Sequence, residues 1–237
     1  MRSDETSHPG TILIVGASRG LGAAMAAEFL RRGWTVIGTV RSDGHAGLRD
    51  LAASHPGRLI IERLDITVPD QIAALRGRLS ARTLDILFVN AGTVGPQPQA
   101  ALADVPTEEF NRVLATNALG AMRAVATLQP LVRPGGMVGV MSSGQGSVAN
   151  NKGGGDDVYR ASKAALNQLM RSHAARHADE ALGFVLMAPG WIRTDLGGSK
   201  APFGIEEAVP EVVDALIAEQ GRPGLRYIDR HGKDVPW

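Results

Sequence analysis

The feature that most constrains the fold is a regular alternation of short apolar runs with segments of helical periodicity. The apolar runs are rich in β-branched residues and several are continuously apolar, which is typical of strands covered on both faces. Helical patterns lie between them, as in the i, i+4, i+8 spacing of Leu21, Met25 and Phe29. We therefore expect an α/β fold, in which one doubly wound and mostly parallel sheet carries helices on both faces. The seven expected strands are residues 11–15, 34–40, 58–64, 84–89, 137–141, 182–187 and 225–228.

The 237 residues are enough for one sizeable domain, and no repeat, low-complexity tract or linker divides them. We expect a single domain over residues 1–237, with a polar N-terminal tail at residues 1–10. Two long loops are expected, at residues 144–157 and 190–207. Loops of that length in a compact domain are usually functional, and residues 190–207 are expected to form a substrate-binding lid.

Composition excludes several classes of function. The 25 basic and 24 acidic residues give a formal net charge of +1, so no strong field attracts nucleic acid or an anionic membrane, and neither is expected as a partner. The chain has no cysteine, which excludes disulfides and thiolate metal sites. The first apolar run is too short for a signal peptide or a membrane span, so a cytoplasmic protein is expected. The sequence does not predict the oligomeric state, and a homo-oligomer is possible.

The sequence G-A-S-R-G-L-G at residues 16–22 stands directly after the first expected strand and directly before the first expected helix. Glycines allow a tight turn and a close approach of backbone, and the N-terminus of the helix offers free N–H groups to a pyrophosphate. This placement is what dinucleotide binding requires, and it predicts a Rossmann fold. A glycine-rich turn without a ligand is the alternative.

The end of the second strand indicates which dinucleotide is bound. An NAD enzyme normally carries an acidic residue about 20 residues after the glycines, where it holds the ribose 2′-hydroxyl. Here the chain has Arg41, and no acidic residue follows until Asp43. Arg41, together with Arg19 of the glycine loop, is suited to a 2′-phosphate because guanidinium donates in a planar fork. NADP(H) is therefore the expected cofactor, although both arginines could also be solvated loop residues.

Tyr159 and Lys163 are four residues apart at the start of an expected helix, and therefore share one face of it. A free phenol has a pKa near 10 and is a poor base at neutral pH. An ammonium group nearby lowers that pKa and makes proton exchange with a substrate oxygen practicable. Such pairs are common on solvated helices, so the interpretation depends on the nucleotide loop upstream.

Further motifs follow in order: residues 90–92 (N-A-G) after the fourth strand, Ser143 after the fifth and residues 189–190 (P-G) after the sixth. Together with the glycine loop and the Tyr159/Lys163 pair, they resemble the signature of short-chain dehydrogenases/reductases over nearly the whole chain. Residues 159–167, 189–198 and 229–237 resemble a narrower branch, that of the sniffer-type carbonyl reductases and the bacterial C-factor-like proteins.

The resemblance implies roles for particular residues. Tyr159 would be the acid/base, and Lys163 would lower its pKa and bind the nicotinamide ribose. Ser143 would hold the substrate oxygen, and Asn117 would anchor a water of the proton relay. The expected cofactor-binding residues are Gly16, Ser18, Arg19, Gly20, Leu21, Gly22, Arg41, Asp65, Ile66, Asn90, Ala91, Gly92, Tyr159, Lys163, Pro189, Gly190, Ile192 and Thr194.

The chain departs from the family pattern at three places. Val15 replaces the usual threonine before the first glycine, and Val89 replaces an asparagine, so two polar ties of the scaffold are lost. Ser143 stands 16 residues before Tyr159, a longer separation than is usual, and residues 151–157 form the expected insert. This leaves Ser142 as the alternative to Ser143.

Three further polar residues need an explanation. Asn117 lies on the apolar stripe of its expected helix, and a buried amide must be hydrogen-bonded, either in the proton relay or merely to a neighbouring backbone group. His173 and His177 have the spacing of a zinc pair, but Ala174 stands where a metalloprotease carries glutamate. No metal is expected, and these histidines are expected at a surface or an interface.

The function that best fits these residues is hydride transfer between NADP(H) and a small aldehyde or ketone, or the corresponding alcohol. The alternative is a cofactor-binding, C-factor-like signalling or regulatory protein with little turnover. The substrate itself depends on loops that the sequence does not predict.

Overall fold

The computed structural model describes residues 9–42 and 46–237. Within this part of the chain one seven-stranded sheet has the order β3-β2-β1-β4-β5-β6-β7, and every pairing of neighbouring strands is parallel. The Rossmann-type α/β fold predicted from the sequence is confirmed. The expected N-terminal tail lies, for residues 1–8, outside the described residues. The strands are β1 (Thr11–Val15), β2 (Thr35–Val40), β3 (Leu59–Arg63), β4 (Leu84–Val89), β5 (Val132–Met141), β6 (Gly183–Ala188) and β7 (Gly224–Asp229).

The strands agree with the expected bounds to within one residue, with the exception of β5. That strand begins at Val132 rather than at residue 137. Its first pairing, between Val132 and Leu84, is separated from the regular register by an irregularity between Leu84 and Ile86. Pro134 and two glycines interrupt the apolar run at this point, and for that reason the hydrophobic pattern did not reveal the extension.

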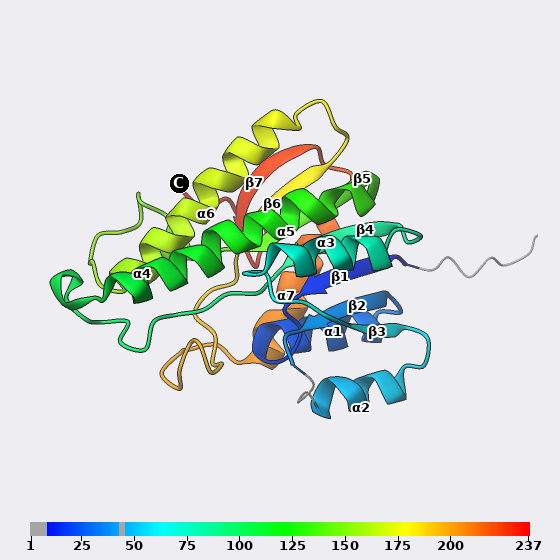
Figure 1. Ribbon diagram of the computed structural model, residues 1–237, viewed down its shortest axis with the longest axis horizontal. Coiled ribbons are helices and arrows are strands. Elements are labelled where there is room, and N and C mark those ends of the chain that lie inside the picture. The colour runs from blue at the N-terminus through cyan, green and yellow to red at the C-terminus, as the bar shows by residue number, and fades with distance from the viewer. Residues whose placement is uncertain (1–8, 43–45) are drawn as a thin grey trace, which may run out of the picture.

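The helices form a layer on each face of the sheet (Figure 1). Helices α3, α5 and α6 pack on one face, whereas α1 and α7 pack on the other and contact each other. Short 3-10 turns η1 (Leu102–Asp104), η3 (Gln129–Leu131) and η4 (Gly144–Gly146) join the layers. The longer elements are α1 (Gly20–Arg31), α2 (Ala46–Ser54), α3 (Pro69–Arg78), α4 (Thr107–Leu114), the π-helical turn η2 (Ala115–Gly120), α5 (Ala121–Leu128), α6 (Asp157–Arg176) and α7 (Ile205–Ala218).

Alternate side chains of each strand enter two separate hydrophobic cores. Leu13 and Val15 of β1 point into the core under α3, α5 and α6, and Ile12 and Ile14 point into the core under α1 and α7. All four are buried. Burial of this kind on both faces accounts for the continuously apolar strands, because a central parallel strand has no solvent face.

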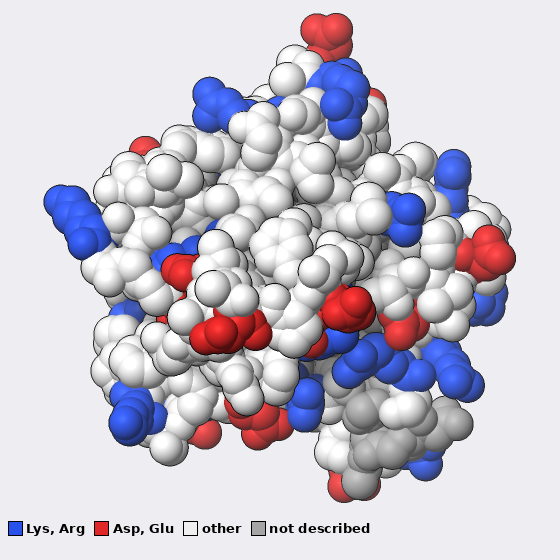
Figure 2. All heavy atoms as spheres, turned by 60° about the vertical axis from the view of Figure 1, so that its left-hand side comes forward, with Lys and Arg blue, Asp and Glu red and all other residues white. Residues whose placement is uncertain are grey.

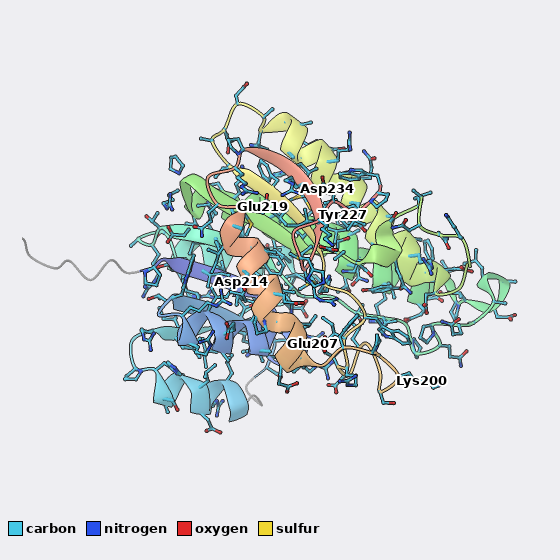
Figure 3. All side chains as sticks on the ribbon, turned by 180° about the vertical axis from the view of Figure 1, so that it is seen from behind. Lys200, Glu207, Asp214, Glu219, Tyr227 and Asp234 are labelled. Atoms are coloured by element: carbon cyan, nitrogen blue, oxygen red, sulfur yellow. The ribbon has the colours of Figure 1, made fainter. Side chains whose placement is uncertain are left out.

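A buried carboxylate fastens α1 to α7. Glu28 accepts hydrogen bonds of 2.7 Å from both Arg31 and Arg32. Arg32 reaches across to α7, where it pairs with Asp214 and donates to the Pro210 carbonyl at 3.2 Å. Figure 3 shows α7 along its length, with Asp214 labelled near its middle. The hydrogen bond from Arg31 outweighs burial and, with Arg32, lowers the pKa of Glu28 to about 2.

The bonds of ionised Glu28 to Arg31 and Arg32 make the free energy of unfolding fall at acid pH. The folded-state pKa of about 2 lies below the ordinary value of 4.5, so the contribution of Glu28 is present above pH 4.5 and is lost as the pH falls toward 2. We expect Glu28→Gln to lower the free energy of unfolding by roughly 2–3 kcal/mol at neutral pH and by much less near the folded pKa. Urea denaturation at a series of pH values measures both curves.

Glu108→Gln, at an exposed position of α4, is the matched control and should follow the wild-type curve. If the free energies of unfolding of the wild type and Glu28→Gln ran parallel throughout the acid range, the lowered pKa of Glu28 would be contradicted.

Candidate functional site

The candidate site lies at the carboxyl edge of the sheet, on the left in Figure 1. The chain leaves β1 for α1 on one side, and β4 continues to α4 on the other, so the connections diverge between these two neighbouring strands. Ligands of doubly wound sheets bind in the crevice that such a divergence opens. Figure 2 looks onto this edge, where uncharged side chains fill the middle and basic side chains gather at the lower right.

In the glycine loop, residues 16–22, the backbone packs closely against itself and against the segment that follows β4. Gly16 has φ +90°, and a Cβ added there would lie 2.8 Å from the Cα of Ala91. A Cβ at Gly22 would lie only 2.0 Å from the Gly16 carbonyl oxygen. The Asn90 side chain donates to that same oxygen at 2.8 Å. Residues 90–92 therefore support the loop from β4, and both glycines are required by the space available rather than only by flexibility.

Thr39 of β2 is a supporting residue that the sequence analysis missed. Its Oγ1 accepts a 2.9 Å hydrogen bond from the Gly16 N–H, and its carbonyl accepts one of 2.8 Å from the Ala17 N–H. Thr39 thus supplies a polar tie to the loop although Val15 has replaced the usual threonine. A threonine within an otherwise apolar buried strand was the available signal.

The charged residues expected at the adenosine end are at the ends of β2 and β3. Arg41 follows β2 and is exposed, and Asp65 lies just beyond β3. Burial acts to raise the pKa of Asp65, but hydrogen bonds from Thr67 and the nearby charge of Arg41 outweigh it, so that pKa is lowered. Arg19 forms an exposed 3.2 Å ion pair with Asp195. Asp43 lies outside the described residues.

Asn117 is completely buried in the π-helical turn η2, between α4 and α5. Its Oδ1 accepts from the Thr93 N–H at 2.7 Å, and its Nδ2 donates to the Thr93 carbonyl at 2.8 Å and to Ser162 Oγ at 3.0 Å. The sequence predicted a regular helix here. The structure has a π-turn, a feature frequent at functional sites, and the amide joins the segment after β4 to Ser162 of α6.

Tyr159 and Lys163 lie on α6 and face the end of β5. The Ser143 side chain lies near the Tyr159 hydroxyl, close enough to lower its pKa in part. Lys163 is buried, with its Nζ 2.7 Å from the Met141 carbonyl and 5.7 Å from the centre of the Tyr159 ring. The structure thus brings together three of the expected catalytic side chains, which are far apart in the sequence.

The two neighbouring serines differ in their surroundings. Ser142 is buried and donates a 2.6 Å hydrogen bond to Asn167 Oδ1. Ser143 is half-buried, and its Oγ accepts from the Gln145 N–H at 3.2 Å in addition to its contact with Tyr159. Of the two, Ser143 is the serine that meets the tyrosine.

The pKa of Tyr159 differs from the sequence-based expectation. Burial raises it to about 12, the nearby Ser143 side chain lowers it in part, and Asp156 and Tyr227 raise it further. Burial likewise lowers the pKa of Lys163 to about 8. The tyrosine pKa is raised where a lowered one was predicted, because desolvation disfavours the phenolate.

The expected lid begins after β6 and is internally hydrogen-bonded. The Arg193 N–H donates to the Phe203 carbonyl at 2.9 Å, and Trp191 Nε1 donates to the Gly197 carbonyl at 2.7 Å. Thr194 lies 3.8 Å from the position of a Cβ added at Gly20, so this loop meets the glycine loop. Residues 205–207, included in the expected lid, are the first turn of α7.

The histidine pair is placed differently from the expectation. His173 is buried, with Nε2 bonded to Gln129 at 2.5 Å, whereas His177 is partly exposed and pairs with Glu180 at 2.6 Å. The surface or interface location predicted for both is wrong for His173, because its ring packs against Phe184 of the core. Among the described residues no group of three or more His, Cys, Asp or Glu could hold a metal ion.

Known proteins share the fold and the motifs of this site. A family model described as enoyl-(acyl carrier protein) reductase matches residues 16–215. A putative short-chain dehydrogenase/reductase from Burkholderia multivorans, crystallised with bound NADP, is 59% identical with a TM-score of 0.94, over 96% of this chain and 99% of that one. The chain belongs to the short-chain dehydrogenase/reductase family.

Two further relatives are informative. A carbonyl reductase from Pseudomonas aeruginosa, solved in complex with NADP, is 36% identical with a TM-score of 0.88, over 96% of this chain and 99% of that one. The C-signal protein of Myxococcus xanthus is 37% identical over 159 residues, which cover 65% of this chain and 93% of the relative. The family predicted from the order of the motifs is therefore confirmed.

Within the described residues, no helix is both long and apolar enough to cross a membrane.

The contact at Gly22 gives a prediction for this family loop. Gly22→Ala places a methyl group against the Gly16 carbonyl and should lower the free energy of unfolding by roughly 1–3 kcal/mol, as overpacking does. The matched control is Gly77→Ala, another helical glycine, where an added Cβ meets nothing within 4 Å. That change should instead stabilise the protein by about 0.5–1 kcal/mol. Chemical denaturation compares the two, and equal effects would contradict the packing argument.

Proposed function

We propose that this protein is an NADP(H)-dependent oxidoreductase that transfers hydride between nicotinamide and the carbonyl or alcohol group of a small aldehyde or ketone. The observation that carries the proposal is the approach of the Tyr159 hydroxyl to Ser143, beside buried Lys163, which lies against the segment 90–92 that supports the glycine loop. Membership of an oxidoreductase family, and a carbonyl reductase among the relatives, support the reaction class.

The residues of the glycine loop and its surroundings fit NADP(H). The close packing of backbone at Gly16 and Gly22, where an added Cβ would collide with Ala91 or with the Gly16 carbonyl, suits the approach of a pyrophosphate to the start of α1. Arg19 and Arg41 would bind a 2′-phosphate, and the adenine would lie against Asp65 and Ile66. Relatives from two bacteria were solved with NADP, which supports the same choice here.

The remaining expected contacts belong to the nicotinamide half of the cofactor. Residues 90–92 would form its floor, Lys163 would hydrogen-bond the ribose, and residues 189–194 would enclose the ring. Residues 190–207 would act as the lid that excludes water. The ion pair of Arg19 with Asp195, which joins the glycine loop to this segment, supports that assignment. When bound, the nicotinamide supplies or accepts the hydride.

The protein side chains supply the proton. In reduction, the substrate carbon gains a hydride and its oxygen takes the proton of the Tyr159 hydroxyl, so that the carbonyl becomes an alcohol. Ser143 Oγ–H would hold the same oxygen while negative charge develops on it. Burial keeps Tyr159 protonated, with a pKa of about 12, which is the form that donates a proton. The positive charge of Lys163 would stabilise the phenolate left behind.

The bonds of Asn117 support a positioning role for its side chain. Because its amide binds Thr93 and Ser162, we assign the side chain to fixing the loop after β4 beside Lys163. The water of a proton relay would then depend on the surrounding π-turn rather than on free amide hydrogens. A role in the relay remains part of the proposal.

The alternative function is a cofactor-binding regulator with little turnover, which the similarity to C-signal favours. The complete set of Ser143, Tyr159 and Lys163 argues for turnover. Oxidation of NADPH by the purified protein with a panel of aldehydes and ketones distinguishes the two. Tight NADPH binding without carbonyl-dependent oxidation would favour the regulator.

Tyr159→Phe tests the proton donor. The change removes one hydroxyl, so folding and NADPH binding should survive while kcat for any reduced carbonyl falls about 10²–10⁴-fold. Single-turnover absorbance measurements at saturating cofactor report this loss. Ser172→Ala also removes a hydroxyl from α6, near its opposite end, and should retain wild-type kcat. A Tyr159→Phe protein with more than about a tenth of wild-type kcat would exclude Tyr159 as the acid.

Arg41→Asp tests the choice of cofactor. Replacing the expected partner of the 2′-phosphate by a carboxylate should weaken NADPH relative to NADH by roughly 1.5–3 kcal/mol, the magnitude of a charge-assisted hydrogen bond. The ratio of kcat/KM for the two cofactors measures this change. Arg49→Asp, an exposed position on α2, serves as the control for net charge. An unchanged ratio in Arg41→Asp would show that Arg41 does not bind the 2′-phosphate.

A further inference from the structure

A second tyrosine lies directly behind the proposed catalytic serine. Tyr227 is on β7, is 2% exposed, and donates a hydrogen bond from its hydroxyl to the main-chain carbonyl of Ser143. Figure 3 shows it beneath the C-terminal segment that carries Asp234. The chain contains two tyrosines, and the reaction as proposed uses only Tyr159.

The hydroxyl of Tyr227 is part of a polar network that holds the turn after β5. Asn167 of α6 accepts a 2.6 Å hydrogen bond from Ser142 and donates one of 3.2 Å to the Gly146 carbonyl. Burial raises the pKa of Tyr227, and the nearby side chains of Asn167 and Ser142 lower it in part. Residues on either side of Ser143 are thus held by α6, and Ser143 itself is held by Tyr227.

The position of the Tyr227 ring is in turn fixed from outside the sheet. The ring of Trp237 packs edge-on against it, with ring centres 5.6 Å apart. The Val235 N–H donates to the Tyr227 carbonyl at 2.8 Å, and the Ala149 N–H donates to the Trp237 carbonyl at 2.9 Å. One side chain therefore connects the C-terminal segment to the turn that carries Ser143.

A hydrogen bond to this carbonyl constrains more than one atom. It fixes the plane of the peptide that follows Ser143, because a peptide unit is rigid, and thereby the direction of the backbone at that residue. A side chain whose backbone is free to tilt cannot keep its hydroxyl on both Tyr159 and a substrate oxygen. Small displacements of reacting groups reduce rates severely.

We propose that Tyr227 is a positioning residue, whose hydroxyl holds the Ser143 main chain so that Ser143 Oγ meets Tyr159 and the substrate oxygen. This inference rests on the proposed role of Ser143. It differs from a role as core filler, since a filler residue would act on folding stability without acting on Ser143.

A double-mutant cycle in kcat distinguishes the two roles. Tyr227→Phe retains the ring and should lower kcat about 5–50-fold, with little change in the Kd of NADPH. In a Ser143→Ala background the same change should lower kcat less than about 2-fold, because the group it positions is gone. Ile72→Val, buried in the same core but remote from the turn, should leave kcat unchanged. An equal loss in both backgrounds, or no loss in either, would overturn the proposal.

A measurement without turnover separates this inference from the proposed function. Labelling with 3-fluorotyrosine gives two ¹⁹F signals, and Tyr227→Phe identifies the one from Tyr159. Loss of positioning should move the Tyr159 signal of Tyr227→Phe in the same direction as in Ser143→Ala, because each change removes the Ser143 contact. Asn167→Ala, which frees the turn from α6, provides a second route to the same displacement if Tyr227→Phe does not fold.

An unmoved Tyr159 signal in the folded variant would overturn the positioning role even if the enzyme is active. If the wild type reduces no carbonyl while the Tyr159 signal does move, the proposed function fails and the structural link between Tyr227 and Ser143 stands.

Discussion

The arrangement at the carboxyl edge depends on how closely two stretches of backbone can approach each other. Helix α1 begins immediately after β1, and its first turn passes so near the Gly16 carbonyl that no side chain fits at Gly22. Asn90 can reach the same carbonyl only because the helix and β4 lie this close. The crevice between β1 and β4 therefore has backbone as its floor, which leaves N–H groups rather than side chains to face a ligand.

A second constraint is that buried polar side chains must find hydrogen-bond partners within the protein. Lys163 and Asn117 are almost or fully removed from water, and each is bonded to backbone of a neighbouring segment. A buried ammonium or amide without such partners would be costly, so these bonds fix where α6 and η2 must lie. The groups assigned to the chemistry thus also hold together the segments that follow β4 and β5. Stability and reactivity at this edge share the same hydrogen bonds.

The sequence predicted the sheet and the family correctly because both follow from local patterns. Continuously apolar runs mark parallel strands, and the order of the motifs is specific to the family. What it could not predict depends on contacts between distant residues. The early start of β5 is paired across an irregular register, and the support of the glycine loop comes from Thr39 on another strand. The raised pKa of Tyr159 follows from burial, which spacing alone does not reveal.

The π-turn at η2 has a geometric consequence for the long helix that contains it. In a π-turn the backbone hydrogen bonds span five residues instead of four, so the turn is wider than that of an α-helix. Burial nevertheless stays on one face through the turn, because Val113 of α4, Asn117 of η2 and Leu128 of α5 are all fully buried. The amide of Asn117 is therefore one polar member of an otherwise apolar face. A single-residue deletion within Ala115–Gly120 would rotate all that follows by about 100°, and would turn either Asn117 away from Thr93 or the apolar residues of α5 away from the core.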